Sequence, residues 1–196
     1  MLYSIIKLNY MKSVLYIIDA QNDFCTPGGS LCCANAEHAV RNIIDLLKNN
    51  EFDSVACTKD SHDDLYLKTI EGKHLPIKHC IYHTDGWKIN QDIYNALYHQ
   101  KAWFSQEKEQ FMLDDYQIEE AFEDMYIEDE EDVKIYVCGF ATDICVLNNA
   151  LILKRHFSNK AEIYVISDCC AGTSEEMHNK ALDIMKVNHI NVIDKL

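Results

Sequence analysis

The sequence predicts an α/β fold in three layers, with helices on both faces of a central, mostly parallel sheet, in a single domain. Short apolar runs bounded by polar turns alternate with segments of helical periodicity, which is typical of this class. The chain has 196 residues, of which 48% are apolar and 26% charged, enough for one domain with its own core. No internal repeat or low-complexity linker divides it. We expect residues 11–196 to form the domain and residues 1–10 to be an N-terminal extension, because Met11 opens a second plausible start.

The elements are expected in the following order. Five apolar residues at 14–18 predict a buried strand that ends at Asp19. Residues 36–49 carry apolar side chains at helical spacing, and the apolar run at 52–58 predicts the second strand. The remaining expected elements are a helix at 92–100, a short strand at 102–104, an amphipathic helix at 115–126, a strand at 133–138, a helix at 143–156, a strand at 161–166, a helix at 175–187 and an edge strand at 190–193.

Charge and cysteine content exclude several classes of protein. The formal net charge is −14. This argues against nucleic acid and anionic membranes as partners, because a protein that binds either needs clustered basic residues. The apolar runs are far shorter than the roughly 20 residues of a membrane span. The nine cysteines are odd in number and contain no Cys-x-x-Cys pair. We therefore expect mostly buried, reduced thiols and a cytoplasmic protein.

Chemically useful side chains follow the predicted strands. Ligands of open parallel sheets bind beyond the carboxyl ends of the strands. Asp19 follows the first strand, Asp60 and His62 follow the second, and Cys145 lies just after the strand at 133–138. An acid, an Asp-x-His pair and a cysteine are thus expected at one edge of the sheet.

Cys145 is the candidate nucleophile. It falls in the first turn of a predicted helix, where free backbone N–H groups and the helix dipole favour a thiolate. The same N–H groups can stabilise an oxyanion. Most cysteines beside an apolar strand belong to a core, so the hypothesis depends on its companions. Asp19 is a suitable proton acceptor, and a lysine after a further strand would complete an activated nucleophile.

Two segments resemble a known family. DAQNDF at 19–24 and GFATDICV at 139–146 are similar to the signatures of the isochorismatase-like cysteine hydrolases, which include the nicotinamidases. The resemblance runs from about residue 12 to residue 193 and implies a Rossmann-like three-layer fold.

The resemblance implies a catalytic triad of Asp, Lys and Cys. Asp19 and Cys145 match by motif. The lysine of the family precedes a Phe-Ser segment, and Lys101 fits that place before Phe104 and Ser105, with Lys108 as the alternative.

The resemblance also implies a cis peptide bond between Phe140 and Ala141. In the family this bond turns the backbone N–H of the alanine toward the site. The N–H groups of Ala141 and Cys145 would then form the oxyanion hole.

A metal site is implied as well. Asp60, His62 and His79 resemble metal ligands of nicotinamidases. The position where a third histidine is common, six residues after the first, holds Lys68. Glu71 and His74 are the nearest substitutes, and we favour Glu71, a carboxylate that suits Zn²⁺, Mn²⁺ or Fe²⁺. One divalent ion, with zinc favoured, is therefore expected. The other histidines, at 83, 99, 156 and 178, are expected to be surface or capping residues.

The activity implied is hydrolysis of a small amide through a thioester, with release of ammonia. Nicotinamide, converted to nicotinate in NAD salvage, is the favoured substrate, and Phe24 and Trp103 are candidates to pack on its ring. Other small amides or ureido compounds remain alternatives, as does a non-catalytic protein of the same fold. The expected partner is the small-molecule amide, and assembly into a homo-oligomer is left open.

Overall fold

A six-stranded, all-parallel sheet forms the centre of the molecule. The computed structural model describes residues 11–124, 133–158 and 160–196; the expected extension at 1–10 and the end of the helix expected at 115–126 lie outside them. The strand order is β3-β2-β1-β4-β5-β6. The strands are β1 (Lys12–Ile18), β2 (Ser54–Asp60), β3 (Trp103–Lys108), β4 (Val133–Phe140), β5 (Ala161–Ala171) and β6 (Asn191–Ile193).

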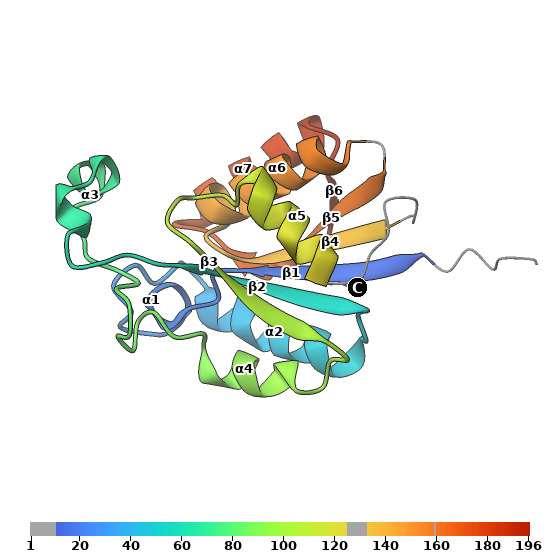
Figure 1. The fold of residues 1–196 in the computed structure, drawn as a ribbon, viewed down its shortest axis with the longest axis horizontal. Helices are drawn as coiled ribbons and strands as arrows, with labels where there is room; N and C mark the ends of the chain where they lie inside the picture. Colours follow the sequence, from blue (N-terminus) through green and yellow to red (C-terminus); the bar gives the residue numbers. More distant parts are fainter. Residues whose placement is uncertain (1–10, 125–132, 159) are drawn as a thin grey trace, which may run out of the picture.

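Helices cover both faces of the sheet. Figure 1 shows α2 (Ala36–Asn49) and α4 (Gln91–Leu97) on one face, and α5 (Asp115–Asp124), α6 (Leu147–Phe157) and α7 (Glu175–Val187) on the other. The three-layer prediction is confirmed. Among the described residues, no helix is both long and apolar enough to cross a bilayer.

The central strands are buried on both sides. All residues of β1 from Val14 to Ile18 are inaccessible to solvent, as expected for a parallel strand covered by helices on both faces. Helix α2 directs Ala39, Ile43 and Leu47 into the core at intervals of four residues. These long apolar patterns are the ones that the sequence predicts well.

The structure differs from the expected elements mainly at their ends. Strand β3 begins one residue later than expected and extends four residues further, to Lys108. It is an edge strand in which polar residues follow Phe104, so its pattern does not mark it as a strand. Three short helical segments were not expected: α1 (Asn22–Cys25), the 3₁₀ turn η1 (Tyr66–Lys68) and α3 (Ile70–His74). In Figure 1 the segment with α3 projects from the body of the domain.

The chain reverses its direction of winding at β1. The first half of the sheet is built outward through β2 and β3, and the second half begins again on the other side of β1 with β4. The crevice outside the carboxyl ends of β1 and β4 is the switch point where such folds bind ligands. The residues that follow β1, β2, β3 and β4 meet at this edge of the sheet.

Candidate active site and metal centre

Asp19, Lys108 and Cys145 form a buried cluster at the switch point. Asp19 directly follows β1, Lys108 ends β3, and Cys145 lies in the turn after β4. Nζ of Lys108 is 2.7 Å from Oδ2 of Asp19 and 3.7 Å from Sγ of Cys145. The side chains of Lys108 and Asp19 are at most 1% exposed. The cluster thus contains a carboxylate, an ammonium group and a thiol, shielded from water.

The lysine of this cluster differs from the one favoured by sequence. Lys101 precedes β3 at the opposite edge of the sheet, where its exposed side chain pairs with Glu51 at 3.4 Å. Lys108 is five residues beyond Trp103, or about 17 Å along the strand, and Lys101 is farther still. The Phe104-Ser105 segment lies in the first half of β3, paired with Ala56 and Cys57. The prediction of Lys101 is therefore corrected to Lys108, its stated alternative.

Asp19 is held in place by its neighbours. Its backbone has a left-handed conformation, with φ of 47°, which aspartate tolerates better than most residues. The hydroxyl of Thr58, on the adjacent strand β2, donates to Oδ1 of Asp19 at 2.6 Å and accepts from the Asp19 N–H at 3.1 Å. Oδ2 is then left for Lys108.

Cys145 lies in a π-helical turn, η2 (Thr142–Val146), that continues directly into α6. The expected cis peptide bond between Phe140 and Ala141 is present, immediately before this turn. Gly139 allows β4 to approach β1 here, because a Cβ atom would lie 2.0 Å from the Ile18 carbonyl oxygen. The side chain of Asn149, fully buried, donates to the Cys145 carbonyl at 2.8 Å and fixes the turn to α6.

Burial and charge shift the pKa of all three groups upward. For Asp19, burial raises the pKa, and the ion pair with Lys108 offsets only part of that effect. Burial would lower the pKa of Lys108, but Asp19, Cys145 and Asp60 raise it above its usual range. Burial, with Asp19 and Asp60 nearby, raises the pKa of the Cys145 thiol, against the opposing effect of Lys108. The raised pKa values favour the protonated forms of Cys145 and Lys108, a thiol and an ammonium group.

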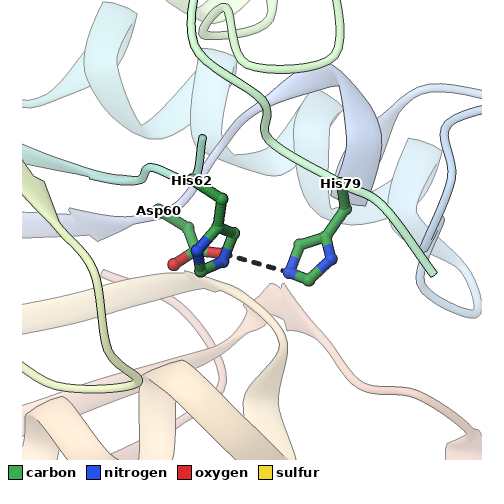
Figure 2. Close-up of side chains that lie close together, drawn as sticks. All are labelled: Asp60, His62 and His79. Atoms are coloured by element: carbon green, nitrogen blue, oxygen red, sulfur yellow. Dashed lines mark hydrogen bonds and ion pairs between the residues drawn. The ribbon is translucent and has the colours of Figure 1, made fainter. Parts of the chain in front are cut away.

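A second buried group lies next to this cluster. Asp60, His62 and His79 direct their ligand atoms toward one another (Figure 2), and these atoms all lie within 4.8 Å of one another. Oδ2 of Asp60 is 3.0 Å from Nε2 of His62 and 3.2 Å from Nε2 of His79. Lys108 connects the two groups, because its Nζ is also 3.5 Å from Oδ1 of Asp60.

The donor set fits a divalent transition metal. Nδ1 of His79 donates to the Ile77 carbonyl oxygen at 2.9 Å, which leaves Nε2, 3.2 Å from Oδ2 of Asp60, as the atom that would lose its proton and bind an ion. Burial would raise the pKa of Asp60, yet hydrogen bonds from both histidines and the charge of Lys108 hold it below its usual range. A carboxylate and two imidazoles are suitable ligands for Zn²⁺, Mn²⁺ or Fe²⁺.

Glu71 lies at the border of this group. Its Oε1 is 3.9 Å from Nε2 of His62, and its side chain is 23% exposed. It is carried by α3 on the projecting segment, and Tyr66 of the same segment packs on both histidine rings, with centroids 4.5 Å from His62 and 4.9 Å from His79. The Tyr66 hydroxyl lies 3.4 Å from Oε1 of Glu71. His74, the other substitute, is exposed.

The two aromatic candidates lie in different places. Phe24 is buried beside the metal group, with its ring edge-on to His79 at 5.7 Å. Trp103 opens β3 at the far edge of the sheet and packs on Tyr94 and Tyr98. Trp103, like Lys101, therefore lies away from Asp19, Lys108 and Cys145, where it was not expected.

Sequence reasoning missed several supporting residues. Gln21 and Asp23 are two of them: both lie within four residues of Asp19 in the DAQNDF segment, Gln21 as the N-cap of α1 and Asp23 inside it. His178, expected to be a surface or capping residue, is half-buried, and its Nδ1 lies 2.8 Å from the Thr142 hydroxyl in η2. No local pattern marks a contact between residues 36 positions apart.

The fold and the site together define a class: a three-layer α/β protein with a buried Asp-Lys-Cys cluster at its switch point. Comparison with known proteins agrees, since the model of the isochorismatase domain matches residues 13–195. The chain belongs to the isochorismatase family and is an isochorismatase-family hydrolase.

Named relatives extend over most of the chain. The nicotinamidase of Schizosaccharomyces pombe is 27% identical, over 92% of this chain and 92% of that protein. The crystal structure of nicotinamidase from Bacillus subtilis has a TM-score of 0.75 and 26% identity, and the match covers 93% of this chain and 99% of that one. A pyrazinamidase of Pyrococcus horikoshii, solved in complex with zinc, has the same fold, with a TM-score of 0.70 and 22% identity over 94% of this chain and 99% of that one.

Proposed function

We propose that the chain is a cysteine-dependent amidohydrolase that converts nicotinamide to nicotinate and ammonia. The observation that carries the proposal is the buried ammonium group of Lys108, in contact with both Asp19 and Cys145. A nucleophile, a proton acceptor and a charge that stabilises both are the components of covalent amide hydrolysis. The choice of nicotinamide is supported by the relatives, which are nicotinamidases.

The proposed reaction uses these groups in turn. Asp19 takes the proton of the Cys145 thiol as Sγ attacks the amide carbon. The backbone N–H groups of Ala141 and Cys145 stabilise the resulting oxyanion. Asp19 then returns the proton to the departing nitrogen, the C–N bond breaks, and ammonia leaves a thioester. Water adds to the thioester with proton transfer to Asp19, the C–S bond breaks, and the thiol regains its proton.

Asp60, His62 and His79, with Glu71 as the fourth ligand, would hold one divalent ion, with zinc favoured. Such an ion supplies a Lewis acid that anchors a lone pair of the substrate beside the nucleophile. Phe24, next to His79, is the proposed contact for the substrate ring.

The domain boundaries and compartment are also proposals. We assign the hydrolase domain to residues 11–196 and treat residues 1–10 as an extension. All nine cysteines are free thiols, which favours a reducing compartment such as the cytoplasm.

Ammonia release from a panel of small amides, with chromatographic detection of the acid, tests the function. Nicotinamide should give ammonia and nicotinate in equal amounts, and Cys145→Ala should lose at least about 10³-fold in kcat, because removal of a nucleophile abolishes the covalent route. Cys57→Ala, a buried thiol outside the site, is the control and should keep its activity. Turnover of a ureido compound in preference to nicotinamide would favour that alternative, and no turnover of any amide would favour a non-catalytic protein.

A further inference from the structure

Gln21 makes an unusual set of contacts two residues after Asp19. Its side chain is fully buried. Nε2 donates to the carbonyl oxygens of Asp60 at 2.8 Å and Trp87 at 2.9 Å, and Oε1 accepts from the N–H of Asp60 at 2.8 Å. The amide thus binds both backbone polar groups of Asp60 and satisfies its own hydrogen-bonding capacity in doing so.

Asp60 needs such a partner because of where it lies in the sheet. Pairing of β1 with β2 ends at Ile17 and Cys57, three residues before Asp60. On the other side, Asp60 still pairs with Lys108 of β3. On the β1 side, where no strand reaches Asp60, the Gln21 side chain makes the hydrogen bonds that a neighbouring strand would make. It thereby fixes the last residue of β2.

The position of the Asp60 backbone decides the geometry of the metal group. Oδ2 of Asp60 is the atom that both histidine Nε2 atoms approach, and Oδ1 faces Lys108. A small displacement of the Asp60 backbone would move its short side chain relative to all three partners at once. We propose that Gln21 is a positioning residue that sets the affinity of the Asp60, His62 and His79 group for a divalent cation. This inference rests on the metal site of the proposed function.

The segment after β1 also contacts the backbone next to the two histidines, through Asp23 of α1. Oδ2 of Asp23 accepts from the Cys80 N–H at 2.7 Å, and the Cys80 carbonyl accepts from the His62 N–H at 3.0 Å. Cys80 follows His79 and has a left-handed backbone, with φ of 44°. Gly86 packs directly against the Asp23 carboxylate, where a Cβ atom would lie 2.1 Å from Oδ2. The segment after β1 is therefore hydrogen-bonded to the backbone of Asp60 through Gln21 and to the backbone of Cys80, which follows His79, through Asp23.

The chain contains a matched control for Gln21. Gln100 is also buried, and its amide has the same pattern: Oε1 accepts from the Phe52 N–H at 3.0 Å, and Nε2 donates to the carbonyl oxygens of Leu47 and Asn50. Gln100 lies before β3, at the amino edge of the sheet and away from the metal group. Replacement of either glutamine by glutamate places a carboxylate against two carbonyl oxygens, so the structural damage is comparable and only the location differs.

Titration of the metal-free full-length chain with Co²⁺, followed by the visible absorption of the bound ion, tests the inference. Gln21→Glu should raise the Kd for Co²⁺ by about 10- to 100-fold and alter the spectrum, as is usual when a group that orients a ligand is removed. Gln100→Glu should lower the melting temperature as much as Gln21→Glu does. Its Kd for Co²⁺ and its spectrum should be those of the wild type. If Gln21→Glu does not fold, Gln21→Met and Gln100→Met form the same comparison without the added charge.

The outcomes are separable. A folded Gln21 variant with the wild-type Kd and spectrum would overturn the positioning role while leaving the metal site intact. An equal loss of Co²⁺ affinity in both glutamine variants would show that the cause is general destabilisation, and it would also overturn the positioning role. If the wild-type chain itself fails to bind Co²⁺ or Zn²⁺, the metal site of the proposed function is wrong and the inference falls with it.

Discussion

At the scale of single residues, Lys108 determines how the buried charges are balanced. Asp19 and Asp60 are both buried carboxylates, and Lys108 contacts both. Removal of this cation would leave the Asp19 carboxylate without a charged partner away from water and would take one charged partner from Asp60. Lys101, seven residues earlier, is exposed and pairs with an exposed glutamate, an arrangement that typically contributes at most about 1 kcal/mol to the free energy of unfolding.

Substitution of Lys108 should therefore have a large effect on activity and stability, and substitution of Lys101 almost none. Lys108→Gln should reduce kcat by at least about 10³-fold and lower the free energy of unfolding by about 3 kcal/mol, because breaking a buried pair costs about 3–5 kcal/mol. Lys101→Gln should leave both nearly unchanged. Steady-state ammonia release and urea denaturation measure the two quantities. Loss of activity in Lys101→Gln with retention in Lys108→Gln would restore the assignment of Lys101.

The pKa of Asp19 predicts the acidic limb of the pH–rate profile. Asp19 has to be ionised to accept the thiol proton, and burial raises its pKa above the ordinary value of about 3.9. As the pH falls through this raised pKa, Asp19 becomes protonated and kcat/KM should decline. The decline should begin at a higher pH than for an exposed aspartate, and Asp19→Asn should have a low residual rate without that limb. An unchanged acidic limb in Asp19→Asn would assign the ionisation to another group.

At the scale of elements, sequence patterns identify long buried segments and miss short ones. β1 and α2 have continuous apolar runs or stripes, so their positions follow from periodicity alone. The helices α1 and α3 have four and five residues, too few to establish a period. β3 lies at the edge of the sheet and ends in the polar run Ser105–Lys108, and only its pairing with β2 shows that it reaches the site. This is why the position of Asp19 was predictable and that of Lys108 was not.

The projecting segment with α3 offers a second pair of contrasting substitutions. Glu71 lies 3.9 Å from His62, whereas His74, at the end of the same helix, is exposed. We expect Glu71→Gln to raise the Kd for Zn²⁺ by about tenfold or more, because the proposed fourth ligand would lose its charge. His74→Ala should bind Zn²⁺ as the wild type does. Competition with a chromophoric chelator measures both values, and the reverse order would make His74 the fourth ligand.

At the scale of the whole molecule, the topology explains why residues distant in sequence meet. The reversal of winding at β1 brings the ends of β1, β2, β3 and β4 to one edge, so positions 19, 60, 108 and 145 become neighbours. The motifs and the predicted strand ends are sufficient to indicate this convergence for Asp19, Asp60 and Cys145. The contacts of Gln21 with Asp60 and Trp87, and of Asp23 with Cys80, depend on loop conformations that no periodic pattern encodes.

Removal of the metal should therefore affect the stability of the entire domain. The candidate ligands come from the end of β2, the projecting segment and the segment before Cys80, so an ion would connect parts of the chain that the sheet alone does not join. A ligand that binds only the folded state stabilises it by about 2.7 kcal/mol at 100 times its Kd, which corresponds to roughly 5–10 °C in the melting temperature of a domain of this size. Addition of excess chelator should lower the melting temperature by about this amount in the wild type and equally in Cys145→Ala, since that substitution leaves the ligands in place.

His79→Ala should melt at the same temperature with and without chelator. A wild-type melting temperature that does not respond to chelator or to added Zn²⁺ would contradict the metal site, while leaving the Asp19, Lys108 and Cys145 cluster to be judged by its own tests.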